Sequence, residues 1–181
     1  MLLVKTSQLS FHLVSIPGIV MVTAMPGFAA VYLNVEQAQQ VIFPGEKFTA
    51  VSLDLSAEKQ KILEEKLGVS LGTMKQKIWR AQNGGYFFVD QVIGKHELIT
   101  YALGINPDGS IRQVEIMEYR EAYGGEIRHK RWRRQFEGKT IASPLALNDD
   151  IKNISGATLS SRHVTEGVKR ILGFYEIALK K

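Results

Sequence analysis

The sequence contains no cysteine among its 181 residues. This absence excludes thiolate nucleophiles, zinc–thiolate sites, iron–sulfur clusters, c-type haem attachment and disulfide bonds. It also removes the cysteine to which a lipoprotein anchor would be attached. A chain without thiols is compatible with an oxidising compartment, so the composition permits export without requiring it.

Charge is almost absent from the amino-terminal part, where Lys5 is the only charged residue before Glu36. Residues 11–30 are largely apolar, and small residues stand at the two positions that a signal peptidase reads before a cleavage after Ala29. The pattern predicts an export signal. An uncleaved membrane anchor is the alternative, because the apolar run is nearly long enough to span a bilayer. We therefore expect residues 1–29 to direct the chain to the periplasm or to the outer face of the cytoplasmic membrane.

The rest of the composition is that of an ordinary globular protein. Hydrophobic residues make up 45% of the chain and charged residues 23%, which predicts one folded domain, with at most a small appendage. The formal net charge is +5 and the isoelectric point is about 9.4. This mildly basic balance suits phosphate-bearing ligands or anionic lipid surfaces, and it equally suits a plain soluble protein.

Residues 30–83 are expected to form a helical amino-terminal segment. Asn34 is a good cap for a short helix in "NVEQAQQVIF", and Ser56 is a cap for a clearer helix that Gly68 can end. No chemistry is assigned to this segment.

From Gly84 onward the sequence changes to strand-like composition. The segments "YFFVDQVI", "ELITYALGI" and "IRQVEIMEY" are rich in β-branched and aromatic residues. The "NPDGS" stretch between the last two is a strong turn signal, so these two strands are predicted to pair as a hairpin. We expect an α+β fold, with a twisted, mainly antiparallel sheet from Tyr86 to about Tyr119 and a carboxyl-terminal helix packed on it.

Two polar segments have competing interpretations. His96 and Glu97 can be read as an acid–base pair, but a solvated turn at residues 94–97 is favoured, because one histidine beside one glutamate specifies no geometry. The basic stretch at residues 127–136 can be read as a nucleic-acid patch. A surface helix with Trp132 and Phe136 packed inward is favoured, with one cation free to face a phosphate or an anionic lipid. An exported protein seldom meets nucleic acid, so no such partner is expected.

The stretch "SGATLSSRHVTEGVKRIL" places small residues directly before a helix. Apolar residues at three-to-four spacing predict that helix to run to the end of the chain, with Ser160 or Ser161 as its cap. A helix amino terminus presents unpaired N–H groups that favour a phosphate. The small residues let a bulky group approach, and Thr158 offers a hydroxyl. A tight turn capped by its own hydroxyls is the plainer alternative.

These residues resemble the flavin-attachment motif of the FMN-binding domain. That domain occurs in the C subunit of the sodium-pumping NADH:quinone oxidoreductase, in the G subunit of the Rnf complex and in small exported flavoproteins. The likeness runs from about Gly84 to Leu172, within an expected domain at residues 84–181. It implies FMN as cofactor, joined by a phosphoester bond to Thr158 through the action of an FMN transferase outside the cytoplasm.

The resemblance also implies a set of cofactor-binding residues. Besides Thr158 they are the neighbours in the motif and an upstream glutamate-plus-glycine turn: Ser155, Gly156, Ala157, Leu159, Ser160, Ser161, Glu121, Gly124 and Gly125. No catalytic residue and no metal ligand is predicted, because the flavin itself would perform the chemistry.

One position departs from the family pattern. The family has an aspartate three residues before the first serine of the motif, whereas this chain has Lys152 there, with Asp149 and Asp150 further upstream. A lysine can weaken recognition by the transferase, or it can pair with the FMN phosphate. Non-covalent binding of FMN or of another phosphate ligand, without a redox role, therefore remains an alternative to covalent attachment.

The function implied is that of an exported electron-transfer flavoprotein that relays electrons between redox partners, one of which can be membrane-bound. The chain is expected to be a carrier or a component of a reductase system, because it is too short to hold a separate substrate domain. A structural protein held at the membrane surface by an uncleaved anchor and a basic helix is a further alternative.

Overall fold

The computed structural model describes residues 30–52, 57–67, 77–121 and 123–180. The expected export signal or anchor, residues 1–29, lies outside the described residues. Within the described ranges, none of the helices combines the length and the apolar character needed to cross a membrane.

The described strands form one antiparallel sheet of six strands in the order β1-β6-β5-β4-β3-β2. Their bounds are β1 (Ala30–Val31), β2 (Phe48–Ala50), β3 (Lys77–Ala81), β4 (Tyr86–Ile93), β5 (Leu98–Ile105) and β6 (Ile111–Tyr119). The three strands predicted between Tyr86 and Tyr119 are confirmed, and so is the α+β class.

The predicted hairpin turn between β5 and β6 is also confirmed. Asn106 receives a hydrogen bond on its carbonyl from the Gly109 N–H, and the Asp108 side chain accepts hydrogen bonds from the backbone and hydroxyl of Ser110. Gly109 has a φ of +88°, a conformation that glycine adopts at little cost. Local turn chemistry therefore sets the pairing of β5 with β6.

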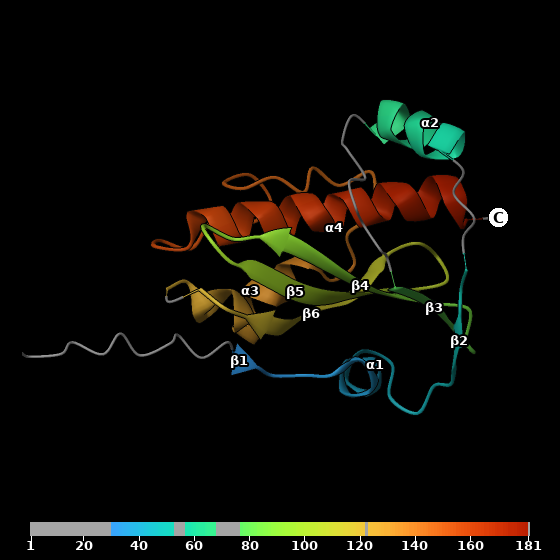
Figure 1. The fold of residues 1–181 in the computed structure, drawn as a ribbon, viewed down its shortest axis with the longest axis horizontal. Helices are drawn as coiled ribbons and strands as arrows, with labels where there is room; N and C mark the ends of the chain where they lie inside the picture. The colour runs from blue at the N-terminus through green and yellow to red at the C-terminus, as the bar shows by residue number, and fades with distance from the viewer. Residues whose placement is uncertain (1–29, 53–56, 68–76, 122, 181) are drawn as a thin grey trace, which may run out of the picture.

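Helices cover both faces of the sheet (Figure 1). The carboxyl-terminal helix α4 (Thr158–Ala178) crosses one face and closes the larger apolar cluster, which contains Tyr101, Leu103 and Val168. Helix α1 (Val35–Ile42) lies on the opposite side and covers a smaller cluster. The sheet is therefore a rigid middle layer, and α4 is held to it along its length.

The amino-terminal segment differs from the expectation of a helical region. Both expected helices are present, α1 and α2 (Ala57–Leu67), and the Asn34 side chain caps α1 as predicted. The segment also contributes three strands: β1 and β2 form the two edges of the sheet, and β3 lies next to β2. These strands are only two to five residues long, so their pairing partners determine them more than their own sequence does.

The basic stretch after β6 is broken into three short helical turns: η1 (Gly125–Arg128), α3 (Lys130–Arg133) and η2 (Arg134–Phe136). The expected inward packing is confirmed, because Trp132 and Phe136 are both buried with ring centroids 5.1 Å apart. Arg133 is not in water as expected. Its guanidinium pairs with the buried Glu115 and donates to the carbonyl of Val114 at 2.7 Å.

A buried polar cluster connects α4 to the sheet. The Asp90 carboxylate accepts hydrogen bonds from the Tyr101 hydroxyl at 2.7 Å and from the Arg170 guanidinium at 2.8 Å. Burial, followed by the charge of Asp90, raises the pKa of Tyr101 well above its ordinary value. The tyrosine therefore stays neutral and donates a hydrogen bond to the carboxylate, and the cluster fixes α4 in register over β4 and β5.

Replacing Asp90 with alanine should be strongly destabilising, because it leaves the partly buried Arg170 and the buried Tyr101 without their common partner. Breaking a buried ion pair costs about 3–5 kcal/mol. The matched control is Glu176→Ala, which removes the exposed pair with Lys180 and should cost less than about 1 kcal/mol. Chemical denaturation of both variants measures the difference. Equal losses in the two variants would contradict a fixing role for Asp90.

Candidate functional site

Helix α4 begins one turn earlier than the sequence predicts. Thr158 is its first residue and Ala157 its cap, with no side-chain capping bond, so the expected cap at Ser160 or Ser161 is wrong. Gly156, at a φ of +82°, reverses the chain just before the helix. The N–H groups of the first turn, from Thr158 to Ser160, therefore have no carbonyl partner within the helix.

A pocket of about 430 Å³ opens at this helix end. Six of the predicted site residues line it: Glu121, Gly156, Ala157, Thr158, Leu159 and Ser160. The other lining residues are Lys95, His96 and Tyr123, which the sequence analysis did not assign to the site. Ser155, Ser161, Gly124 and Gly125 do not line this pocket. The structure thus brings the upstream turn and the small-residue motif to one place, from segments more than thirty residues apart.

The Glu121 carboxylate acts as a clamp on a neighbouring turn. Its Oε1 accepts hydrogen bonds from the backbone N–H of His96 at 2.5 Å and of Glu97 at 3.0 Å. The turn at residues 94–97 is closed by a bond from the Gly94 N–H to the carbonyl of Glu97, which confirms the turn expected there. Burial raises the pKa of Glu121, but the backbone N–H groups of Glu97, His96 and Lys95 outweigh it and lower the pKa. The side chain is therefore an anion at neutral pH, and it holds one wall of the pocket.

Gly124 has a different role from the other predicted residues. It packs against the start of α4 with a φ of +90°, and a Cβ atom there would lie 2.6 Å from the Tyr119 hydroxyl and 2.8 Å from the Ala157 Cβ. A side chain at this position would be strained and would collide with both. Gly125 has open space around it. Gly124 thus supports the site by permitting close approach.

Tyr119 joins the same two segments through its hydroxyl. The hydroxyl lies 2.5 Å from the carbonyl of Tyr123, to which it donates, and 3.1 Å from Ser160 Oγ. Burial raises the pKa of Tyr119, and the Ser160 hydroxyl opposes that shift only in part. Because the Ser160 hydroxyl is engaged in this contact, the backbone N–H of Ser160 is the group that it can offer to a ligand.

Thr158 is exposed, and its hydroxyl oxygen accepts a hydrogen bond from Asn153 Nδ2 at 3.1 Å. The Asn153 Oδ1 atom is buried and has no hydrogen-bond partner in the described part of the chain. Asn153 also lines a second pocket, of about 410 Å³, together with Lys152, Trp132 and Arg131. Thr158 therefore borders the first pocket and is connected through Asn153 to the second.

The main chain at Lys152 is fixed, and its side chain is exposed. Its N–H donates to the Gln135 side chain at 2.8 Å, and its carbonyl accepts from the Trp132 indole at 2.7 Å. Asp150, further upstream, is engaged elsewhere: it pairs with Lys139 and accepts the N–H of Ala146. Lys152 is therefore a charged side chain beside the motif that is available to a ligand.

Comparison with known protein families gives one match, to the FMN-binding domain, over residues 94–173. This part of the chain is an FMN-binding domain. The match lies inside the domain expected at residues 84–181, and it identifies FMN as the cofactor of this flavoprotein. The comparison with curated proteins finds no match.

The residues at the start of α4 fit the phosphate end of FMN. Unpaired N–H groups and the positive end of a 21-residue helix favour an anion. No atom lies within 4 Å of the Cβ position at Gly156, so a bulky group can approach the backbone there. The orphan Oδ1 of Asn153 is an acceptor that can receive an N–H or O–H of the cofactor.

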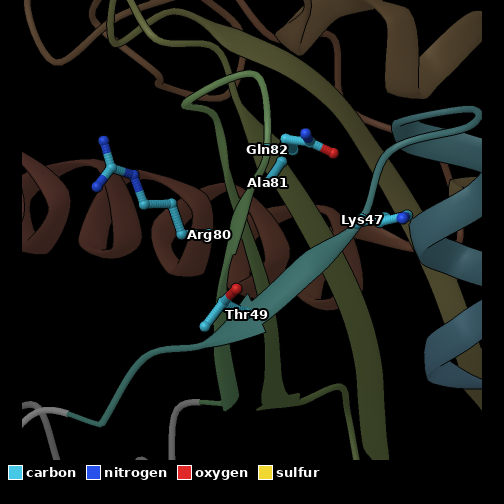
Figure 2. A pocket seen from close by; sticks show the side chains of 5 residues that line it. All are labelled: Lys47, Thr49, Arg80, Ala81 and Gln82. Atoms are coloured by element: carbon cyan, nitrogen blue, oxygen red, sulfur yellow. The ribbon is translucent and has the colours of Figure 1, made fainter.

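A third pocket, between β2 and β3, carries no comparable arrangement. It is lined by Lys47, Thr49, Arg80, Ala81 and Gln82. Figure 2 shows the side chains of Lys47 and Arg80 pointing away from each other. Its polar groups do not converge on one ligand position, so the start of α4 is the candidate functional site.

Glu121→Gln should lower the free energy of unfolding at pH 7 by about 1 kcal/mol, because a charged acceptor is exchanged for a neutral one. The folded state lowers the pKa of Glu121. The carboxylate therefore stabilises the fold fully at pH values above the ordinary pKa of glutamate, and this stabilisation is lost as pH falls through the lowered pKa. The difference between variant and parent should therefore disappear at acid pH. Thermal unfolding against pH measures it.

The control is Glu97→Gln, since the Glu97 side chain is exposed and only its backbone contacts Glu121. This change should have little effect at any pH. A loss of unfolding free energy in Glu121→Gln that does not change with pH would contradict this role of the Glu121 carboxylate.

Proposed function

We propose that this protein is an exported electron carrier whose FMN is attached covalently, through a phosphoester bond to Thr158. One observation carries the proposal: an FMN-binding domain presents an exposed threonine hydroxyl at the first residue of α4, beside unpaired helix N–H groups. A phosphoester formed there keeps a negative charge at the position where the helix favours it.

The chain's own residues would hold the phosphate in a defined way. The N–H groups of Thr158, Leu159 and Ser160 would donate to its oxygens, because the helix leaves them without partners. Asn153 Nδ2, which donates to Thr158 Oγ1, is close enough to turn to a phosphate oxygen once that hydroxyl is esterified. Lys152 would supply a counter-charge. In this way Lys152 would compensate for the missing aspartate.

The reaction chemistry belongs to the cofactor. When bound, FMN accepts and donates one or two electrons. The protein binds it, orients it and limits its loss, which is valuable outside the cytoplasm where free FMN is scarce. Maturation requires an FMN transferase, and turnover requires a redox partner protein, which can be membrane-bound. The amino-terminal pattern of residues 1–29 supports export.

A second candidate is a module that holds FMN without a covalent bond. The substitution of Lys152 for the aspartate of the family pattern favours it, because the transferase can depend on that residue. Lys152 could then bind the phosphate directly as an ion pair.

The intact mass of the exported protein separates these candidates. The protein is produced in a host that has an FMN transferase, beside Thr158→Ala and the control Ser155→Ala, which removes an exposed neighbouring hydroxyl. The transferase moves the FMN phosphoryl group from an activated FMN donor to Thr158 Oγ1, and the hydroxyl proton is released with the rest of the donor. The mass should therefore rise by FMN minus water. We expect this gain in the parent and in Ser155→Ala, and not in Thr158→Ala.

The other outcomes are equally informative. Yellow protein of unmodified mass would establish non-covalent binding. A gain that persists in Thr158→Ala would place the ester on another residue. Colourless, unmodified protein would overturn the proposed function.

A further inference from the structure

Several cations on the surface next to the flavin site have no ion-pair partner among the described residues. They are Arg128, Lys130, Arg131, Arg134 and Lys152, here called the basic patch, and all five are exposed. Arg133 stands apart from them because it is mostly buried and paired with Glu115. The packing of Trp132 and Phe136 into the core anchors the backbone of the segment, so the outward cations all extend from an anchored stretch of chain.

The charge of the basic patch is poorly neutralised. The ion pairs found in the described ranges involve other cations, namely Arg120, Arg133, Lys139, Arg170 and Lys180. One carboxylate, Glu126, lines the same pocket as Arg131 and Lys152. An excess of positive charge on one face produces a local field that attracts anionic partners and raises their rate of association.

The basic patch adjoins the place where the flavin is bound. Arg131 and Lys152 line the pocket that Asn153 also lines, and Asn153 donates directly to Thr158. In Figure 1, α3 and the first turn of α4 lie at the same end of the molecule, and β2 lies toward the other end.

Exposed apolar side chains also lie at the flavin pocket. Tyr123 is 86% exposed and Leu159 is 39% exposed, and both line the flavin pocket. Ile93 and Leu98 are cross-strand partners at the end of the hairpin whose turn lines that pocket, and both are exposed. Exposed apolar side chains beside polar and charged residues are typical of a protein-binding surface.

We propose that the basic patch and these apolar side chains form the docking face for an acidic electron-carrier protein. The inference rests on the proposed electron-carrying function. Charge complementarity selects an acidic partner and steers it to the face where the flavin is closest. Electron-transfer complexes are small and transient, so a single patch next to the cofactor is sufficient. A bilayer docked on this face would instead cover the flavin site.

The test measures reduction of the yellow holoprotein by reduced plant-type ferredoxin, a small acidic carrier used here as a probe. Each ferredoxin gives up one electron and its cluster is oxidised. Two ferredoxins and two protons from water complete the reduction of one FMN. The variant is Lys130→Glu with Arg134→Glu, neither of which lines the flavin pocket. The control is Lys47→Glu with Arg80→Glu, an identical change of net charge at the β2–β3 pocket (Figure 2).

At low ionic strength, the second-order rate constant should fall about tenfold or more in the patch variant and less than about twofold in the control. High salt should remove the difference, because it screens exposed charges. The glutamine variant Lys130→Gln with Arg134→Gln should show an intermediate loss. Flavin absorbance, and reduction by a small uncharged reductant, should be the same in all variants, which confirms folding and loading.

An equal fall in the patch and control variants would overturn the proposal, because net charge alone would then explain the rates. An unchanged rate would also overturn it. Binding to phosphatidylcholine vesicles that contain phosphatidylglycerol is measured as well. If this binding is salt-sensitive and is lost in the patch variant, while the ferredoxin rate is retained, the patch is a lipid-binding face and the proposal is overturned. A colourless parent protein would count against the proposed function itself, which keeps the two failures distinct.

Discussion

The close contact between Gly124 and Ala157 is the constraint on which the functional site depends. The backbone after β6 approaches the start of α4 so closely that a Cβ on Gly124 would lie 2.8 Å from that of Ala157. The Tyr119 hydroxyl bridges the same two segments. Because of this contact, the loop that carries Glu121 and the helix that carries Thr158 form the walls of one pocket.

The rest of the fold keeps that contact in place. The buried Asp90–Arg170 pair fixes α4 along the sheet, and Glu121 holds the turn at residues 94–97 by its backbone N–H groups. The side chains of the site are thus held by other elements, while the first N–H groups of α4 are left for an anion. The proposed binding of the FMN phosphate rests on this helix end, which the fold leaves open and supports on both sides.

Much of the central fold could be predicted from the sequence. The β-branched and aromatic segments gave the three long strands, and the turn residues between Asn106 and Ser110 gave their pairing, because both signals are local. The short strands β1, β2 and β3 could not be found in this way. A strand as short as Ala30–Val31 exists because β6 offers it an edge, and that partner lies almost ninety residues away in the chain.

The site was predictable in its motif but not in its supporting contacts. The small residues before α4 pointed to Thr158, and the glutamate-plus-glycine turn pointed to Glu121. The sequence could not show that Glu121 binds backbone groups, that Ser160 is held by Tyr119, or that Asn153 reaches Thr158. The helix start was misplaced because serine is a common cap, whereas here the positive φ of Gly156 sets the first turn.

The most direct test of the account is the phosphorus NMR spectrum of the exported protein after it is unfolded and freed of small molecules. A phosphate monoester has a second pKa of about 6, so its signal shifts with pH near neutrality. A phosphodiester has no such ionisation. The account predicts one phosphorus signal that stays with the chain and does not move between about pH 5 and pH 8. A signal that titrates in this range, or a chain without phosphorus, would contradict a phosphoester-bound FMN at Thr158.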